Sequence, residues 1–445
     1  MGEKLMDMIL RNARIHSREG LWDIRISDGR IAKISKGLRG THDETLDLKG
    51  RLVMPSFIDM HVHLDAVFTS GYSELNTSGT LLEGITVWGD TRRKLTSDLI
   101  RRKAGEALKW MVSNGTTRLR THADTSEPDL RIVKALLDVR EGFRHLMDIE
   151  VTAFPQDGIL TADRYLPQLE KAMEMGADNV GLIPHNEYTR EDGVRSVKIA
   201  FEIAEENDKK VDGHIDETDD PQSRFLEVVA AETIRRGFQG RVTAGHTTAM
   251  HSYDNAYAFK LFQLLKKAQL TIVPNPLTNI HVQGRFDTYP KRRGMTRVKE
   301  LLEAGINVAL GHDCIMDPWY PLGMGDMMQP LFMAVHIGHM MGHQDLVTAF
   351  DLITHNSAKA LGVSDQYGVE EGKLADLVVL DARNEIEALA KQATRTYVFK
   401  GGVLVARNTE GVREVRTNGR FEELDCLPLE ITSKGGEKKG KMGQI

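Results

Sequence analysis

Two histidines one residue apart, His61 and His63, offer the clearest chemistry in the sequence. They follow a short apolar run, residues 52–54, of the kind that forms buried strands. Because alternate residues of a strand point to the same side, both imidazoles can face one side of a sheet and bind one metal ion. Histidine pairs of this kind also occur without a metal, so this motif alone leaves a structural role open.

Further residues with acid–base or metal-binding side chains lie at or just after the ends of other strand-like runs. They are His214, Glu217, His246 and Asp313. If these runs belong to one parallel sheet, the carboxyl ends of its strands bring the side chains together. Three histidines and one aspartate with room for water are typical of a catalytic rather than a structural metal site. A purely structural role would require the same placement on several strands by coincidence, so we predict a metal-dependent enzyme.

The elements that must position these residues alternate along residues 56–363. Short apolar runs are separated by amphipathic segments of helical length, several of which end at a glycine. Strands are predicted over residues 117–121, 149–153, 180–183, 210–214, 242–246, 271–274 and 307–311, and helices over 97–113, 166–175, 195–206, 222–236 and 296–303. With the strand that ends at His63, about eight such units are present. They predict an α/β fold of the TIM-type (β/α)8 barrel class.

Shorter β-type runs return at both ends of the chain. Residues 1–55 and 364–430 are predicted to form one small β-sandwich domain, into which the barrel is inserted. Gly401 and Gly402 separate two apolar runs and predict a hairpin. Residues 431–445 are polar and rich in glycine and lysine, which predicts a disordered tail.

The composition excludes several classes of protein. A formal net charge of −6 gives no indication of a surface for nucleic acid or membrane, so a small-molecule substrate is expected. Two cysteines exclude a disulfide framework as the main stabilising feature and favour a reducing cytoplasm. The chain has no uninterrupted apolar run of about 18 residues, and we therefore expect no transmembrane helix.

Four short motifs together resemble those of the amidohydrolase superfamily. They are HVHLD at 61–65, HIDE at 214–217, GHTTAMHSY at 245–253 and GHD at 311–313. Longer blocks, among them SGTLLEGI at 78–85, AFPQDGIL at 153–160 and DPWYPLG at 317–323, resemble the bacterial cytosine deaminases within that superfamily. The similarity extends from about residue 60 to residue 360, nearly the whole predicted barrel.

The resemblance implies a metal site and a set of roles. It implies that His61, His63, His214 and Asp313 hold one divalent metal ion per subunit, Zn²⁺ or Fe²⁺. It further implies catalytic roles for Glu217, as the acid–base carboxylate beside the ring nitrogen, and for His246 and Asp313, which assist the metal-activated water. The residues that we place in the substrate pocket are Gln156, which reads the lactam edge of the base, and Leu81, Phe154, Cys314 and Trp319.

The function that follows is hydrolytic deamination of a free cytosine-type base to the uracil-type product and ammonia. Residues 180–187 contain no lysine that could bridge two metals, which favours a one-metal deaminase over a ring-opening hydrolase. Two alternatives stay open: deamination of another lactam-amine base such as isoguanine, and a catalytically silent barrel that serves as an oligomeric scaffold. Methionine-rich helices make a homo-oligomer the expected assembly.

One residue departs from the pattern of cytosine deaminases. These read GHDD, whereas this chain reads Gly311-His312-Asp313-Cys314. A cysteine removes a charge and some bulk from the pocket wall, and admits a substituent at C5 of the base. The hypothesis is therefore that 5-methylcytosine or another 5-substituted cytosine is a good substrate. The alternative is a neutral exchange that leaves cytosine preferred.

Overall fold

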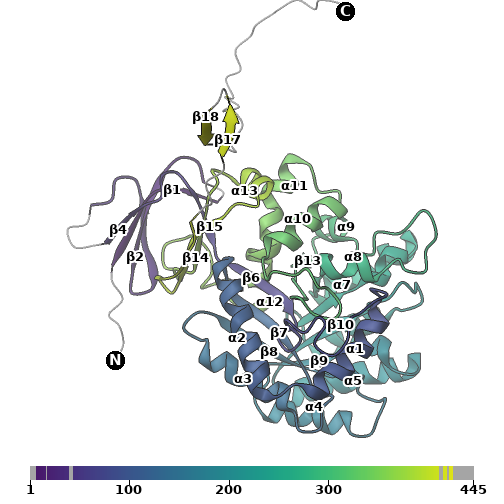
Figure 1. The fold of residues 1–445 in the computed structure, drawn as a ribbon. Coiled ribbons are helices and arrows are strands. Elements are labelled where there is room, and N and C mark those ends of the chain that lie inside the picture. The colour runs from purple at the N-terminus through teal and green to yellow at the C-terminus, as the bar shows by residue number, and fades with distance from the viewer. Residues whose placement is uncertain (1–6, 17, 40–43, 410–413, 418–419, 424–445) are drawn as a thin grey trace, which may run out of the picture. The chain divides into compact units, whose positions relative to one another are not determined.

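Eight parallel strands form one curled sheet in the computed structural model, which describes residues 7–16, 18–39, 44–409, 414–417 and 420–423 (Figure 1). Neighbouring strands follow the chain order without exception. They are β6 (Phe57–Val62), β7 (Thr116–Asp124), β8 (Asp148–Phe154), β9 (Asn179–Leu182), β10 (Lys210–Ile215), β11 (Val242–His246), β12 (Thr271–Val273) and β13 (Asn307–Val308). The predicted α/β class with a parallel sheet is thereby confirmed, and the curled sheet is consistent with a TIM-like barrel.

Backbone hydrogen bonds join the segment after β13 to β6, the first strand of the series. The Asp313 N–H donates to the His61 carbonyl at 2.7 Å, and the His63 N–H donates to the Asp313 carbonyl at 2.9 Å. β13 itself ends at Val308, earlier than the predicted residue 311. The backbone from Ala309 onward bonds instead to β12 and to β6, and this irregular segment brings Asp313 beside the two histidines of the first strand.

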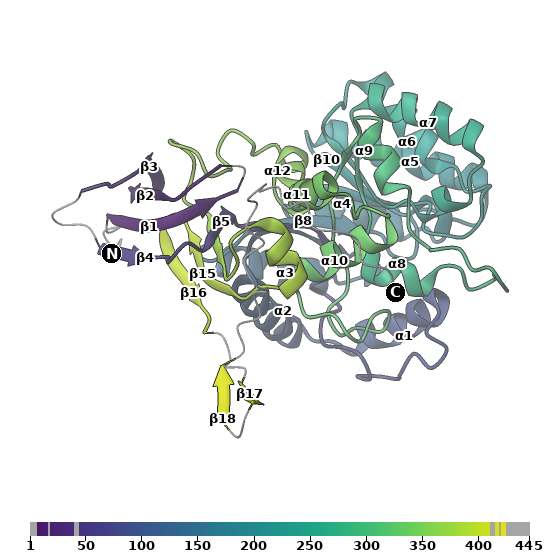
Figure 2. The same cartoon turned by 90° about the horizontal axis from the view of Figure 1, so that it is seen from above.

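Helices follow the strands along the chain and lie on the outside of the sheet (Figures 1 and 2). They are α1 (Leu81–Lys94), α2 (Ser97–Ser113), α3 (Arg131–Gly142), α4 (Tyr165–Glu174), α5 (Arg190–Glu206), α6 (Phe225–Arg236), α7 (Asn255–Ala268), α8 (Pro276–Val282), α9 (Val298–Glu303), α10 (Met328–Ile337), α11 (His343–Thr348) and α12 (His355–Leu361). Helix α2 has the predicted bounds, because Thr96 caps it and Ile100, Ala104, Leu108 and Met111 form one buried stripe.

Strands from both ends of the chain meet in a second, mixed sheet (Figure 2). Its order is β16-β15-β14-β5-β1-β2-β3, with β4 paired to β1. The strands are β1 (Met8–Ile15), β2 (Trp22–Ser27), β3 (Arg30–Ser35), β4 (Glu44–Asp47), β5 (Leu52–Pro55), β14 (Leu377–Leu380), β15 (Arg395–Lys400) and β16 (Val403–Arg407), and helix α13 (Glu385–Lys391) lies between β14 and β15. The predicted hairpin at Gly401-Gly402 joins β15 to β16. The sandwich form and the domain boundaries stay predictions, since residues 1–408 form one compact unit.

The described residues beyond Asn408 belong to a second unit. Its described part is an antiparallel pair of strands, β17 (Glu414–Thr417) and β18 (Arg420–Glu423). The tail predicted for residues 431–445 lies outside the described residues.

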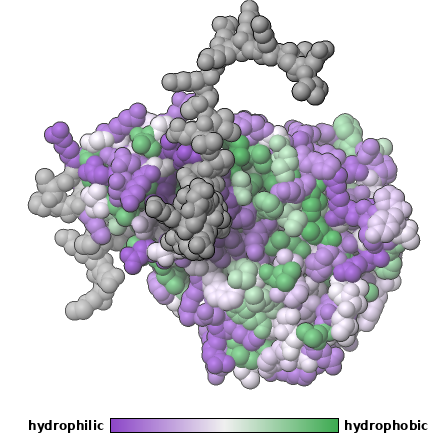
Figure 3. Space-filling model, turned by 45° about the horizontal axis from the view of Figure 1, so that its top comes forward, coloured by the Kyte–Doolittle hydropathy of each residue, from purple (hydrophilic) through white to green (hydrophobic). Residues whose placement is uncertain are grey.

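Large apolar side chains are concentrated inside the molecule. The main cluster of buried residues fills the space between the parallel sheet and its helices, and a smaller one lies at the second sheet. On the face drawn in Figure 3, hydrophobic and hydrophilic residues are interspersed. None of the helices in the described part of the chain combines the length and the apolar character needed to cross a membrane.

A half-buried histidine directly after β1, His16, pairs with one carboxylate of α13 and one of the segment before α12. His16 Nδ1 lies 2.6 Å from Glu385 Oε1, and His16 Nε2 lies 3.9 Å from Asp351 Oδ1. Burial alone would lower the pKa of His16, but the two carboxylates more than offset this and raise the pKa to about 9. His16 is therefore a site where the stability of the fold depends on pH.

We expect His16→Gln to lower the free energy of unfolding near pH 6 by on the order of 2 kcal/mol, and to have little effect at pH 10. The folded-state pKa lies above the unfolded value of about 6.5, so the stabilisation is complete below that value and is lost as pH rises through 9. Urea unfolding of both proteins at the two pH values measures this. The exposed His145 provides the control variant, and an equal loss at both pH values would contradict the prediction.

Candidate metal centre and substrate cavity

Four histidine rings converge at the carboxyl ends of the parallel strands. His61 lies in β6 and His63 directly after it, His214 lies in β10, and His246 ends β11. Their exposed fractions are 6% or less. The ring centroids of His61 and His63 are 5.4 Å apart, and that of His214 lies 4.5 Å from His61 and 5.1 Å from His63. The structure thus brings together histidines that are separated by up to 185 residues in the sequence.

The nitrogen and oxygen atoms of these side chains face one another. His63 Nε2 lies 3.1 Å from His214 Nε2, and Asp313 Oδ1 lies 3.5 Å from His61 Nε2 and 3.6 Å from His63 Nε2. Both ring nitrogens of His61 are buried without a hydrogen-bond partner among the described residues. Buried polar atoms that lack a partner are costly, and a cation at this point would satisfy them. The donor set of three nitrogens and one oxygen therefore fits a divalent metal ion.

The backbone adopts unusual conformations to aim two of these side chains. Asp313 has φ 71° and His246 has φ 62°, values that non-glycine residues rarely adopt. Gly311 lies so close to β6 that a Cβ atom there would be 2.5 Å from the Cβ of His61. A side chain at position 311 would displace Asp313 from the histidines. Backbone strain of this kind is often found at functional sites.

Glu217 lies beside the histidine cluster in a buried position. Its Oε1 atom is 3.3 Å from His246 Nδ1, and 6% of the residue is exposed. Burial, with a contribution from the charge of Asp313, raises the pKa of Glu217 well above its usual value. A carboxyl group with a raised pKa keeps its proton to higher pH and is suited to deliver it to a substrate atom.

Two asparagines orient the ring of His246. The side-chain nitrogen of Asn279 lies 2.8 Å from His246 Nδ1, and that of Asn275 lies 3.3 Å from both ring nitrogens. Burial lowers the pKa of His246 well below its usual value, so the imidazole is neutral and able to accept a proton. The sequence analysis assigned no role to these asparagines, which are the N-cap of α8 and a residue in the middle of that helix.

Three buried aspartates support the histidines, and the sequence analysis assigned a role to none of them. Asp59 Oδ1 accepts backbone N–H groups of His61 and His312, and so joins β6 to the segment that carries Asp313. Asp65 Oδ1 lies 3.7 Å from His63 Nδ1, and Asp212 Oδ2 lies 3.0 Å from His122 Nε2, whose ring centroid is 4.1 Å from that of His61. For Asp59 and Asp212 the available signal was their spacing of two residues from a candidate ligand in the same strand, because such residues share a strand face. Asp65 lies in the turn after β6.

Asp65 changes the protonation of His63. Burial lowers the pKa of His63, but the interaction with Asp65 more than offsets this and raises the pKa to about 9. Asp65 lies on the Nδ1 side of the ring, while Nε2 faces His214 and Asp313. Carboxylates that hold metal-binding histidines in this way are common in metal sites.

A cavity of about 550 Å³ opens onto the cluster. Glu217, His246 and Asp313 contribute to its wall. The predicted pocket residues Gln156, Leu81, Cys314 and Trp319 also line it. The fifth, Phe154, is not among the described lining residues: it is fully buried and stacks on His214 with centroids 4.1 Å apart.

Cys314 lies in the cavity wall close to Asp313, Asp317 and Thr278. It is 2% exposed, and burial raises the pKa of its thiol well above the usual value, so the thiol is neutral. Trp319, 7% exposed, lies nearby in the chain, with its ring centroid 6.2 Å from that of His63. A small neutral side chain at position 314 therefore borders the cavity directly beside the candidate ligand Asp313.

The sequence of this chain is similar to those of known amidohydrolases and deaminases. A sequence model described as "Amidohydrolase family" matches residues 44–138 and 97–406. The chain is 31% identical to the N-isopropylammelide isopropyl amidohydrolase of Pseudomonas sp. (strain ADP), over 91% of this chain and 98% of that protein. It is 30% identical to the pterin deaminase of Rhizobium rhizogenes, over 90% and 92% of the two chains.

A crystal structure of 5-methylcytosine deaminase from Klebsiella pneumoniae, liganded with 5-fluorocytosine, is also similar. It is 44% identical to this chain, has a TM-score of 0.88, and the match covers 91% of this chain and 99% of that chain.

Proposed function

The chain belongs to the amidohydrolase family and is a hydrolase of carbon–nitrogen bonds, and from this premise we propose that it deaminates a free cytosine-type base. The products would be the uracil-type base and ammonia. The observation that carries the proposal is the buried Glu217, whose pKa is raised by burial, at the wall of a cavity that also presents His63, His214 and Asp313. The kinship with the 5-methylcytosine deaminase of Klebsiella pneumoniae supports the cytosine-type ring.

The proposed roles follow from the chemistry of each side chain. His61, His63, His214 and Asp313 would hold one divalent metal ion, which when bound makes water a stronger nucleophile at neutral pH. His246, which is neutral, and Asp313 would accept the proton of the water that attacks C4. Glu217 would protonate the ring nitrogen N3 as C4 becomes tetrahedral, and a proton relayed to the exocyclic amine would release ammonia as the C4–N bond breaks.

The recognition of the base is assigned to Gln156. Its side chain lines the cavity, and its backbone carbonyl accepts a hydrogen bond from Asn186 Nδ2 at 3.0 Å. An amide offers one donor and one acceptor group, which match the N1–H and C2=O edge of a cytosine-type base. Phe154, stacked on His214, would act by holding a ligand ring rather than by contacting the base.

The direct experiment is an ammonia-release assay of the metal-loaded protein with four bases: cytosine, 5-methylcytosine, 5-fluorocytosine and isoguanine. We expect the highest kcat/KM with a 5-substituted cytosine. Turnover of isoguanine alone would replace the proposed substrate by another lactam-amine base. A metal-loaded protein that releases no ammonia from any of the four would contradict the enzyme proposal and favour an oligomeric scaffold.

Cys314→Asp is expected to lower kcat/KM for 5-methylcytosine relative to cytosine by about 10- to 100-fold, since one methyl group in a fitted pocket is worth a discrimination of this order. A carboxylate would replace a small neutral wall beside Asp313, and crowd the substituent at C5. Cys314→Ser, which keeps the size of the side chain, provides the matched control and is expected to keep the preference. If Cys314→Asp lowered kcat/KM equally for cytosine and 5-methylcytosine, Cys314 would not determine the preference at C5.

A further inference from the structure

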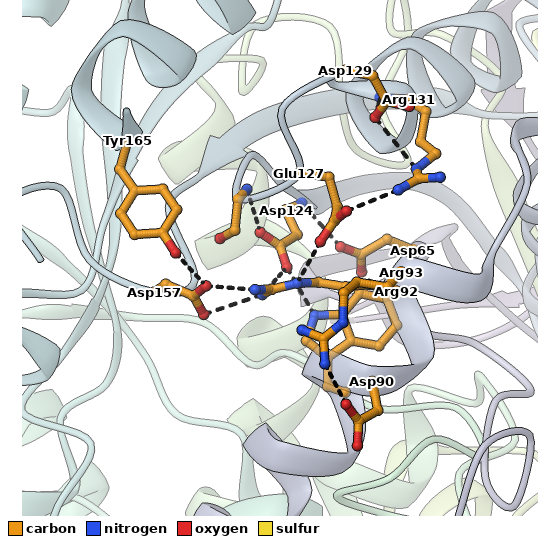
Figure 4. Close-up of polar contacts among 12 residues, drawn as sticks. Asp65, Asp90, Arg92, Arg93, Asp124, Glu127, Asp129, Arg131, Asp157 and Tyr165 are labelled. Carbon is orange, nitrogen blue, oxygen red and sulfur yellow. Dashed lines mark hydrogen bonds and ion pairs between the residues drawn. The ribbon is translucent and has the colours of Figure 1, made fainter. Parts of the chain in front are cut away.

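A single arginine pairs with three carboxylates beside the substrate cavity (Figure 4). Arg92 lies in the last turn of α1, and its side chain is 7% exposed. Its Nη1 atom donates to Asp124 Oδ2 at 2.9 Å, its Nε atom donates to Glu127 Oε1 at 3.2 Å, and its two Nη atoms bind Asp157 at 3.1 and 2.5 Å. A planar guanidinium with five N–H donors can make all of these bonds at once, whereas an ammonium group cannot.

The three carboxylates lie at or just after the carboxyl ends of two neighbouring strands, β7 and β8. Asp124 is the last residue of β7, Glu127 follows it closely, and Asp157 lies in the turn after β8. Asp157 also accepts the hydroxyl of Tyr165, the first residue of α4, at 2.9 Å. Arg92 therefore ties α1 to the carboxyl ends of two strands, the edge of the sheet at which the catalytic cluster lies.

One face of α1 forms part of the cavity wall and its support. Gly84, Trp88 and Arg92 lie four residues apart on the same face and are all buried. At Gly84 a Cβ atom would be 2.4 Å from Trp319 Cδ1, so the helix backbone packs directly against that ring. Trp88 Nε1 donates to the same Asp124 oxygen as Arg92, at 2.9 Å. Leu81 and Ile85, near the start of the same helix, line the cavity.

Two of the three carboxylates connect Arg92 to residues proposed to bind the base and the metal. Asp157 directly follows Gln156 in the chain. The Asp124 N–H donates to Asp65 Oδ2 at 3.0 Å, and the other oxygen of Asp65 faces His63 at 3.7 Å. The network therefore has the α1 wall on one side and the Gln156 turn on the other, and its central cation is Arg92.

We propose that Arg92 is a positioning residue, which sets the width of the substrate cavity by holding α1 against the ends of β7 and β8. It touches neither the cavity nor the candidate metal ligands and acts through Asp124 and Asp157. Without the full set of ion pairs, α1 moves away from the Gln156 turn, and the base is held less closely between Trp319 and Gln156. The inference goes beyond the proposed function and rests on it only for the substrate used in the kinetic test.

The kinetic test compares two matched pairs of variants. Asp157→Asn and Arg92→Lys weaken the ion pairs of the network but keep a polar side chain at each position. Asp90→Asn and Arg93→Lys make the same changes in the neighbouring ion pair of α1, where both side chains are exposed (Figure 4). We expect Asp157→Asn and Arg92→Lys to raise KM by about tenfold with kcat within about twofold, because a wider cavity loses binding in ground state and transition state alike. Asp90→Asn and Arg93→Lys are expected to keep both constants.

A second readout needs no substrate. The chain has four tryptophans, and replacing Trp22 and Trp110 by phenylalanine leaves Trp88 and Trp319, both in contact with α1 or part of it. In this background Asp157→Asn is expected to increase the quenching of fluorescence by acrylamide at least twofold over Asp90→Asn, with metal content unchanged. If no base is deaminated, the proposed function fails but the quenching still decides this inference.

Three outcomes would overturn the positioning role. One is quenching in Asp157→Asn equal to that in Asp90→Asn. Another is a fall in kcat at constant KM. The third is a lower melting temperature with KM unchanged, which would make the network a stabilising feature only.

Discussion

Glu217→Gln is expected to lower kcat for deamination by about 10²- to 10⁴-fold, the usual range for loss of a general acid or base. The glutamine keeps the size of the side chain and a polar group beside His246, but it has no proton to exchange with the ring nitrogen of the base. Glu217 is not one of the four proposed ligands, so metal content should be unchanged. Steady-state kinetics and metal analysis of the purified variant measure the two quantities.

The exposed Asp220, which also lines the cavity, supplies a control for Glu217. Asp220→Asn removes one negative charge from the cavity rim and should change kcat by less than about threefold, as an exposed charge is strongly screened. If Glu217→Gln kept most of the wild-type kcat, the proton would have to reach the base by another route. Loss of metal in this variant would instead assign Glu217 to the ligand set.

Removal of the metal is expected to lower deamination by at least about 10³-fold, because the stabilisation lost amounts to several kcal/mol. Dialysis against a chelator followed by addition of Zn²⁺ or Fe²⁺ should restore activity, and the metal that restores the higher kcat/KM identifies the better cofactor. His214→Ala should lose metal as well as activity, since one of three ring nitrogens would be missing.

His185→Ala is the matched control for the ligand histidine. His185 also lines the cavity, but it belongs to none of the groups of side chains close enough to share an ion among the described residues. Its variant should keep the metal. Activity of the metal-free protein equal to that of the loaded protein would contradict the proposed role of the four ligands.

The candidate site could be predicted from the sequence to a large extent because its signals are local. The His61–His63 spacing follows from the alternation of side chains along a strand, and His214 and His246 end apolar runs that form β10 and β11. The helix ends at Gly115, Gly176, Gly237 and Gly305 have the positive φ that glycine allows. A motif of residue types at fixed spacing can be read wherever one element carries it.

Other features depend on contacts between distant segments and have no local pattern. Asp313 reaches β6 only through an irregular segment in which its own φ is 71°, whereas a regular strand was predicted up to residue 311. Phe154 belongs to a motif block but packs behind His214. The sequence analysis predicted neither α1 nor a role for Arg92, and only the approach of β7 and β8 gives this residue three carboxylate partners.

The candidate metal site depends on both the sequence and the tertiary structure. Its four proposed ligands are His61, His63, His214 and Asp313. The sequence by itself determined which residue types stand at strand ends, and with them the class of chemistry, because strand periodicity and helix termination are set by neighbours in the chain. The tertiary structure alone decided how close these side chains lie, which of them are held by Asp59 or Asp65, and how wide the cavity beside them is. The reason is physical: distances between strands depend on the packing of the whole sheet and its helices, to which every element contributes.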